Sequence, residues 1–233
     1  MPRDRELLID AYELVYIDAF PNVDERESLP SIIECLTKKT SGWYGLNNYH
    51  VLVGVDSQNS PAAIAICDFL ANAKVGVVEF LAVRKSFRRQ GLGSQILSRA
   101  SDLLLCDAKT SSNFRFLIAE ITDPQTTKIN RDIQPRDRAI FWQHMGFLKI
   151  DFPYIQPPLS EEKNPVRDLV LLAKPLGIES GTNISSLHLR KIISNYQKWA
   201  MGIEDVGTNP FFIEMSSWLC SHNNFSLVSL LPD

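Results

Sequence analysis

The chain of 233 residues carries 24 Lys and Arg against 27 Asp and Glu, a net charge of -3, so it lacks the basic excess typical of nucleic-acid-binding proteins. No apolar run approaches the roughly 18 residues that a membrane-spanning helix needs, and the charged start MPRDRELLID lacks the apolar core of a secretory signal. The four cysteines (Cys35, Cys67, Cys106 and Cys220) are widely scattered and form no metal-binding motif, so we expect free thiols, a cytoplasmic location and no metal site.

The first third of the chain predicts two helices followed by two strands. Apolar residues at helical spacing over 8–19 predict an amphipathic helix that ends near Phe20-Pro21. Ser31-x-x-Glu34 has the pattern of a capping box, which predicts a second helix that Ser41-Gly42 ends. Two strands are expected next, at residues 50–55 and 61–69, each followed by a short polar turn.

The stretch VVEFLAVRKSFRRQGLGSQILSRA, residues 77–100, predicts a strand, a basic turn, a glycine loop and a helix. The apolar, β-branched start is typical of a buried strand, and apolar residues recur at helical spacing after Gly91 and Gly93. The first amides of a helix lack intrahelical partners, and glycine lets a ligand approach the backbone closely. We therefore predict that this loop binds phosphate or pyrophosphate, with the nearby arginines neutralising charge.

The remaining elements alternate between strands and helices. We expect a strand at 114–121, a loop at 126–138, a helix at 139–144 stopped by Gly146, and strands at 148–155 and 169–173. The strand–helix–strand order around residue 100 implies a parallel pair with a right-handed crossover. A linker at 177–185 precedes two further amphipathic helices, near 189–201 and near 215–219.

Two familiar phosphate-binding motifs do not match the glycine loop. A P-loop needs Lys followed by Ser or Thr after its last glycine, and a dinucleotide fingerprint needs a third glycine or alanine where Ile96 stands. The loop instead resembles the acyl-CoA loop of the GCN5-related N-acetyltransferase (GNAT) superfamily, Arg/Gln-x-x-Gly-x-Gly/Ala, through Arg88, Gly91 and Gly93. The preceding Leu81-Ala82-Val83 resembles the family's fourth strand.

A second segment supports the resemblance. AIFWQHMGF at 139–147 is similar to the family pattern Ala-x-x-Phe-Tyr-x-x-x-Gly-Phe. The resemblance covers about residues 1–175 and implies an α/β fold, the GNAT acyl-CoA N-acyltransferase fold, with a mixed, mostly antiparallel sheet and helices on both faces. Residues 176–233 are expected to form a helical extension that packs on the core or on a second subunit, which leaves a homodimer open.

The resemblance also implies how acetyl-CoA is bound. Backbone amides of the loop would hold its pyrophosphate, and the backbone of Leu81, Ala82 and Val83 would run along the pantetheine arm like an added strand. The Val83 amide would polarise the thioester oxygen, and the thioester would lie where the two parallel strands splay apart. The coenzyme-binding residues implied in the loop and the following helices are Arg88, Arg89, Gln90, Gly91, Leu92, Gly93, Ser94 and Phe141.

Acetyl transfer to an amine also needs a base and an acid. Glu79 is the first candidate for the base, because a carboxylate in an apolar strand requires a partner, water or a ligand. Strand alternation would place it on the face of Leu81 and Val83. Glu120 is the alternative base. In the family a tyrosine that protonates the coenzyme A thiolate usually stands where Trp142 sits, so Tyr154, water or an unassisted thiolate with a pKa near ~8.5 is left for that step.

From these residues we expect a cytoplasmic N-acetyltransferase that moves the acetyl group of acetyl-CoA to a primary amine by direct attack, without an acyl-enzyme. Two alternatives stay open at this point. One is a non-catalytic GNAT-fold module that binds acyl-CoA and regulates a partner, and the other is transfer of a longer acyl chain. The nature of the amine acceptor, whether small molecule or protein, does not follow from the sequence.

Overall fold

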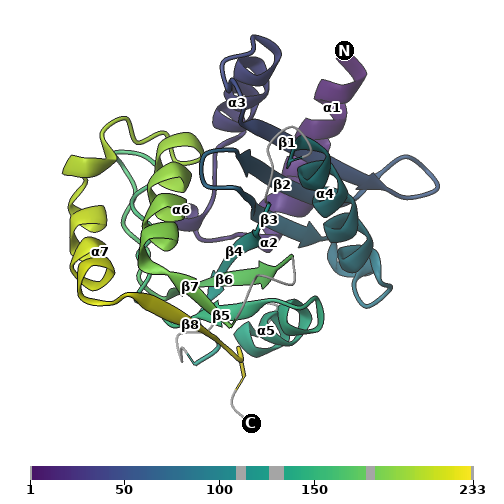
Figure 1. Cartoon of the computed structure of the whole chain (residues 1–233). Coiled ribbons are helices and arrows are strands. Elements are labelled where there is room, and N and C mark those ends of the chain that lie inside the picture. Colours follow the sequence, from purple (N-terminus) through teal and green to yellow (C-terminus); the bar gives the residue numbers. More distant parts are fainter. Residues whose placement is uncertain (1, 109–113, 126–133, 177–181, 232–233) are drawn as a thin grey trace.

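The computed structural model describes residues 2–108, 114–125, 134–176 and 182–231, which form one mixed sheet flanked by helices (Figure 1). Eight strands in these residues have the order β1-β2-β3-β4-β6-β5-β8-β7. β3 and β4 pair in parallel, whereas the other neighbours pair antiparallel. The strands are β1 (Asn48–Val55), β2 (Pro61–Leu70), β3 (Val75–Val83), β4 (Phe116–Thr122), β5 (Leu148–Ile150), β6 (Leu169–Pro175), β7 (Asn183–Ser185) and β8 (Asn224–Val228).

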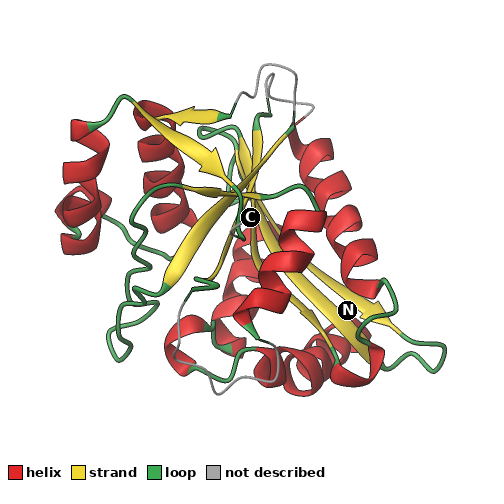
Figure 2. Ribbon diagram, turned by 90° about the horizontal axis from the view of Figure 1, so that it is seen from below, coloured by secondary structure: helices red, strands yellow, loops and turns green. Residues whose placement is uncertain are grey.

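Helices cover both faces of this sheet (Figure 2). α4 (Leu92–Ala108) and α5 (Pro135–His144) pack on the face that carries Val78. The opposite face, which carries Val77 and Phe80, is covered by the N-terminal helices and by the C-terminal α6 (Ser186–Trp199) and α7 (Pro210–Ser221). The N-terminal helices are α1 (Pro2–Ala11), the π-helical η1 (Tyr12–Tyr16), α2 (Ile17–Ala19) and α3 (Leu29–Thr40). The α/β fold class with a mixed, mostly antiparallel sheet is therefore confirmed.

Several predicted boundaries are wrong for local reasons. α3 begins earlier than its capping-box pattern predicted, because Ser28 and not Ser31 is the N-cap: the Ser31 amide donates to Ser28 Oγ at 3.2 Å. α5 begins at Pro135, so the end of the predicted 126–138 loop is helical. β5 ends at Ile150, well before residue 155. Parts of the predicted loops and linker, at 109–113, 126–133 and 177–181, lie outside the described residues.

The C-terminal segment contains strands as well as the expected helices. β8 pairs with β5 through Lys149↔Val228 and Ile150↔Leu227, and β7 pairs with β8, so the segment extends the sheet. α6 and α7 lie side by side (Figure 1) and bury apolar side chains in the same cluster as β4 and β6. The segment thus contains the two expected helices and adds two short strands that the sequence did not predict, because these strands alternate too briefly to stand out.

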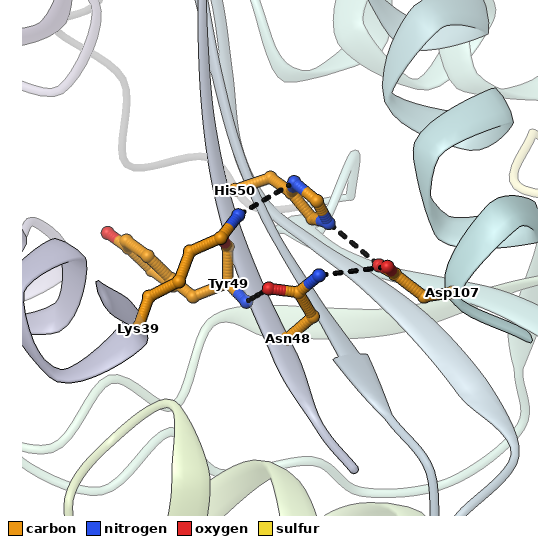
Figure 3. A network of polar contacts seen from close by, with 5 residues as sticks. All are labelled: Lys39, Asn48, Tyr49, His50 and Asp107. Carbon is orange, nitrogen blue, oxygen red and sulfur yellow. Dashed lines mark hydrogen bonds and ion pairs between the residues drawn. The ribbon is translucent and has the colours of Figure 1, made fainter. Parts of the chain in front are cut away.

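A polar network fixes α4 and α3 to the edge strand β1 (Figure 3). His50 Nε2 lies 2.7 Å from Asp107 Oδ2 on α4, and Asn48 Nδ2 donates to the other oxygen of Asp107 at 2.8 Å. Lys39 of α3 lies 3.2 Å from His50 Nδ1 and donates to the Tyr49 carbonyl at 2.7 Å. These contacts hold the C-terminal end of α4, the helix whose other end forms the glycine loop.

None of the helices in the described part of the chain combines the length and the apolar character needed to cross a membrane.

Candidate active site

The glycine loop presents a row of backbone amides at the start of α4. Arg89 and Gly91 have positive φ angles of 61° and 79°, which turns successive amides toward one side of the loop. Among the described residues, the backbone amides from Arg89 to Ser94 donate to no partner, and the first helical bond to this loop runs from the Gln95 amide to the Gly91 carbonyl at 3.1 Å. Such a concave row of free amides at a helix N-terminus suits a phosphate or pyrophosphate group.

The two arginines of the loop have different surroundings. Arg88 Nε donates to the Val83 carbonyl at 3.0 Å, and its Nη2 lies 3.8 Å from Asp18 Oδ2. Arg88 therefore ties the loop to the end of β3 and to α2. Arg89 is exposed, so its guanidinium is the one of the pair that solvent or a ligand can reach freely.

A gap opens between β3 and β4 next to the loop. Their ladder runs from Val75↔Phe116 to Val78↔Ala119 and stops there. The Arg84 amide donates to the Ala62 carbonyl at 2.8 Å, which sets the phase of the antiparallel β2–β3 ladder. Because hydrogen-bonding direction alternates along such a ladder, the N–H and C=O groups of Leu81 and Val83 point away from β2 and into the gap. β3 thus has an edge inside the sheet that pairs with no strand beyond Val78, and on this edge the Val83 carbonyl accepts from Arg88 Nε.

A cavity of about 810 Å³ occupies this gap. Its walls come from both faces of the sheet: Gly93 and Phe141 line it on the α4 and α5 side, and Ala19 and Phe20 line it on the α2 side. The cavity is also lined by residues of β3, the glycine loop, β4 and α5, among them Glu79, Leu81, Val83, Arg88, Arg89, Gly91, Ser94, Glu120, Asp137, Arg138 and Trp142. The cavity therefore connects the amide row to the carboxylates of β3 and β4.

Close packing brings α4, β3 and α5 together at Gly93. A Cβ at this position would lie 3.4 Å from Phe141 Cε2 and 3.6 Å from Val83 Cγ2, which is ordinary van der Waals contact. Phe141 packs edge-on against Trp142, with ring centroids 5.6 Å apart, and Trp142 packs against Phe147 at 4.7 Å. Trp142 is only 7% exposed, so it acts as an apolar wall of the cavity.

Glu79 lies in a β-bulge that sequence periodicity could not show. The partner of Ile66 is Phe80 and the partner of Cys67 is Val78, so Glu79 is an extra residue with no partner on β2. Beyond the bulge, Leu81 packs with the α4 side of the sheet, whereas the groups that interact with the Glu79 carboxyl come from the other side. The prediction that Glu79 shares a face with Leu81 and Val83 is therefore wrong.

The Glu79 carboxyl forms a buried pair with Asp68 of β2. Burial, and then the charge of Asp68, raises the pKa of Glu79 well above its ordinary value, and a hydrogen bond joins the two carboxyls. Burial raises the pKa of Asp68 to about 6, opposed by the hydrogen bond from Glu79. Glu79 Oε1 and Asp68 Oδ2 have no hydrogen-bond partner among the described residues. Of the two carboxyls, Glu79 therefore holds its proton more tightly than Asp68.

Glu120 stands across the gap from Glu79, one residue beyond the last paired position of β4. The Tyr196 hydroxyl of α6 donates to Glu120 Oε1 at 3.2 Å, and Glu120 Oε2 is buried with no partner in the described part of the chain. Burial raises the pKa of Glu120 to about 7, while the hydroxyls of Tyr154 and Tyr196 oppose that rise. Glu120 can therefore carry or release a proton near neutral pH.

Comparison with known proteins decides the family. A family model described as the acetyltransferase (GNAT) family matches residues 9–125, half of the chain. The chain belongs to the GNAT acetyltransferase family. Its residues 77–94 supply the strand, loop and helix start described above, and members of this family transfer acyl groups from acyl-CoA.

A solved structure agrees on the fold, and two others are similar over part of it. A GNAT-family protein from Bacteroides thetaiotaomicron is 18% identical, covers 88% of this chain and 97% of its own length, and has a TM-score of 0.58. A phosphinothricin acetyltransferase from Sinorhizobium meliloti, in complex with AcCoA, is 15% identical with coverages of 74% and 85% and a TM-score of 0.49. The ribosomal-protein-S18-alanine N-acetyltransferase from Escherichia coli is 18% identical, with coverages of 74% and 91% and a TM-score of 0.47. A comparison with curated proteins finds no match.

The GNAT site has the features that acyl-CoA needs. The amide row between Arg89 and Ser94 suits the pyrophosphate, and the unpaired edge at Leu81 and Val83 suits the amides of the pantetheine arm. Exposed Gln90, whose Nε2 donates to the Ser86 carbonyl at 3.2 Å, lies in the loop. Leu92 packs with the cluster on the α4 side of the sheet, and Ala82 packs with the cluster of the N-terminal helices on the other face. Within the described residues, no group of three or more His, Cys, Asp or Glu side chains is arranged to hold a metal ion.

Tyr154, the predicted acid, lies outside the cavity lining. Its side chain is buried on the α6 side of the sheet, and its hydroxyl approaches Glu120 without forming a well-aligned hydrogen bond to a described residue. Burial, and then the charge of Glu120, raises the pKa of Tyr154 well above its ordinary value, which makes it a poor proton donor.

Sequence reasoning missed Asp68 and Tyr196. Asp68 is the single charged residue of the otherwise apolar strand β2, so the same argument that selected Glu79 could have found it. In the sequence, Tyr196 is one apolar position of the amphipathic helix expected near 189–201. Its hydroxyl contact depends on how α6 packs against β4, which no local signal reports.

Proposed function

We propose that this protein is an N-acetyltransferase that moves the acetyl group of acetyl-CoA directly to a primary amine. The observation that carries the proposal is a cavity that joins the free amide row at Gly91 to Glu79, the carboxyl paired with Asp68. One end suits a pyrophosphate and the other end suits proton removal from an ammonium group. The open β3 edge lies between them.

The coenzyme would be held mainly by backbone groups. Amides from Arg89 to Ser94 bind the pyrophosphate, and exposed Arg89 neutralises part of its charge. The pantetheine arm adds to β3 along the gap, with the backbone groups of Leu81 and the amide of Val83 supplying the hydrogen bonds. The Val83 amide then faces the thioester oxygen and stabilises the negative charge that develops there during attack.

The amine enters from the Phe20 side of the cavity and loses its proton to the carboxyl pair. Glu79 accepts that proton on one oxygen while the proton it already holds passes to Asp68, so the negative charge of the pair is neutralised. The nitrogen lone pair then attacks the thioester carbon, a C–N bond forms, and the C–S bond breaks with its electrons passing to sulfur. Glu120 is the alternative base, since it lines the same cavity.

The departing thiolate receives its proton from solvent in this proposal. Trp142 has no acidic proton to give, and Tyr154 lies outside the cavity lining. A coenzyme thiol with a pKa near ~8.5 is a tolerable leaving group without assistance.

Trp142 has no acidic proton and Tyr154 lies outside the cavity lining, and this lack of an acid favours one alternative, a GNAT-fold module that binds acyl-CoA without catalysis. The deciding experiment measures free thiol released from acetyl-CoA with small amines, amino acids, peptides and aminoglycosides as acceptors, beside acyl-CoA of increasing chain length. Acetyl-CoA should also raise the melting temperature, because a ligand that binds only the folded state stabilises it. A thermal shift without thiol release for any acceptor would favour the binding module. Absence of both would contradict the proposed function.

A further inference from the structure

The walls of the gap carry two carboxyl groups, and acetyl transfer requires only one of them as a base. Glu79 of β3 and Glu120 of β4 each follow the last paired position, Val78↔Ala119, and both line the cavity. Their strands are still paired one residue earlier, so the two groups line the same cavity from opposite walls of the gap. If Glu79 and Asp68 remove the proton, Glu120 is free for another task.

Glu120 has hydrogen-bond donors but no cation. Tyr196 Oη donates to Oε1 at 3.2 Å, and Tyr154 lies beside it. No Lys, Arg or His in the described part of the chain forms an ion pair with Glu120, and Oε2 has no partner there. A shielded carboxylate without a counter-charge is costly, so a cationic ligand would offset that cost.

Tyr196 places this carboxyl from a segment outside the family match. It belongs to α6, 76 residues from Glu120 in sequence, and is only 3% exposed. α6 is anchored there by Leu189, Ile192 and Ile193 in the cluster shared with β4. The orientation of Glu120 is thus set by the C-terminal segment and not by residues 9–125.

We propose that Glu120 binds a second nitrogen of the acceptor and that Tyr196 is its positioning residue, so that the acceptor is a short diamine or another amine with a second cationic group. This inference rests on the proposed acetyl transfer. One nitrogen gives its proton to the Glu79–Asp68 pair and is acetylated, while the other stays charged beside Glu120.

The charged and titratable groups around Glu120 come from four elements. They are Glu79 on β3, Glu25 on η2 (Val23–Glu25), Tyr154 after β5 and Tyr196 on α6. Asp137 and Arg138 of α5 line the same cavity, and Arg138 Nη2 donates to the Ala19 carbonyl at 3.4 Å. The basic side chains Lys85, Arg88 and Arg89 line the cavity at its glycine-loop end, whereas Glu79, Glu120 and Asp137 face Arg138 alone at the other end, which favours a cation there.

The test compares 1,3-diaminopropane with propylamine, which has the same chain length but lacks the second nitrogen. Thiol release should give a kcat/KM at least tenfold higher for the diamine. Glu120→Gln should reduce that ratio to near one. Calorimetric titration of 1,3-diaminopropane with coenzyme A present should show at least a tenfold weaker Kd in Glu120→Gln, a readout that needs no turnover.

Tyr196→Phe separates positioning from simple structural support. Its hydroxyl favours the ionised form of Glu120, so its removal should move the low-pH limit of diamine binding to higher pH. Tyr12→Phe is the matched control, because the Tyr12 hydroxyl donates to the Glu27 carbonyl at 3.1 Å and does not contact Glu120. This control should leave the pH limit in place.

The outcomes separate the two proposals. If thiol is released equally well with propylamine and the diamine, or if Glu120→Gln keeps the diamine preference, the inference is wrong and acetyl transfer stands. If acetyl-CoA neither shifts the melting temperature nor releases thiol, the proposed function fails, and the inference fails with it. An unchanged pH limit in Tyr196→Phe would overturn the role of Tyr196.

Discussion

Replacing Glu120 with glutamine should measure what burial of this carboxyl costs the fold. Burial raises its pKa from the ordinary 4.5 to about 7. A carboxyl whose pKa is higher in the folded state binds more protons there than in the unfolded chain. Its favourable contribution is therefore complete below pH 4.5, and it is lost as the pH rises through about 7.

The size of the effect follows from the same values. Each tenfold difference in proton affinity corresponds to about 1.4 kcal/mol, so between pH 5 and pH 8 the native protein should lose about 2 to 3 kcal/mol through Glu120 alone. Glutamine keeps an oxygen for the Tyr196 hydroxyl and has no charge to bury. For a chain of this length the difference corresponds to roughly 5–10 °C in melting temperature.

The assay is chemical unfolding of both proteins at several pH values from 5 to 8. The free energy of unfolding of Glu120→Gln should exceed that of the native protein at pH 8 and approach it at pH 5. The control is Glu214→Gln, an exposed carboxyl paired with Arg167, which should leave the slope of the pH curve unchanged. Parallel curves for the native protein and Glu120→Gln would refute the reasoning.

Three further predictions concern the loop, the base and the C-terminal segment. Gly91 and Gly202 have left-handed φ angles of 79° and 68°, and a Cβ would meet no crowding at either position. Replacing either glycine with alanine should therefore lower the free energy of unfolding by about 1–2 kcal/mol. Only Gly91→Ala should abolish the thermal shift with acetyl-CoA. Glu79→Gln should lower the acetylation rate at least tenfold at neutral pH, and by less at high pH, where the amine is already neutral. The thermal shift with acetyl-CoA should be kept. If Glu120→Gln shows this rate loss and Glu79→Gln does not, Glu120 is the base. Truncation after Lys174 should expose β5 and the cluster beneath α6, and give an aggregated protein in size-exclusion chromatography; a soluble, equally stable monomer would contradict this.

The central part of the fold could be predicted because its signals are local. β3, the basic turn and α4 follow one another within about 30 residues, and each has its own pattern of apolar spacing, charge or glycine. Elements whose structure depends on partners distant in the sequence are harder to predict. β8 is a strand because β5 offers it an edge, and Ser28 caps α3 although Ser31-x-x-Glu34 has the stronger motif.

In the candidate site too, features set by local sequence could be predicted and features set by long-range packing could not. The free amides near Gly91 follow from the local loop and could be expected from the sequence. The direction of Glu79 could not, because counting alternate residues assumes a regular strand, and the bulge changes the count at that position. The pairing of Glu79 with Asp68 and the contact of Glu120 with Tyr196 both depend on how distant elements pack.

The distance in sequence between Glu120 and Tyr196 has a consequence for synthesis on the ribosome. The coenzyme loop is complete once residue 94 has been made, whereas the residue that orients Glu120 comes about 100 residues later. At roughly 5–20 residues per second, this interval lasts about 5 to 20 seconds. In the proposed function, a growing chain therefore contains its whole coenzyme-binding loop before α6 can position Glu120, and selection of the amine is completed only after that loop has been made.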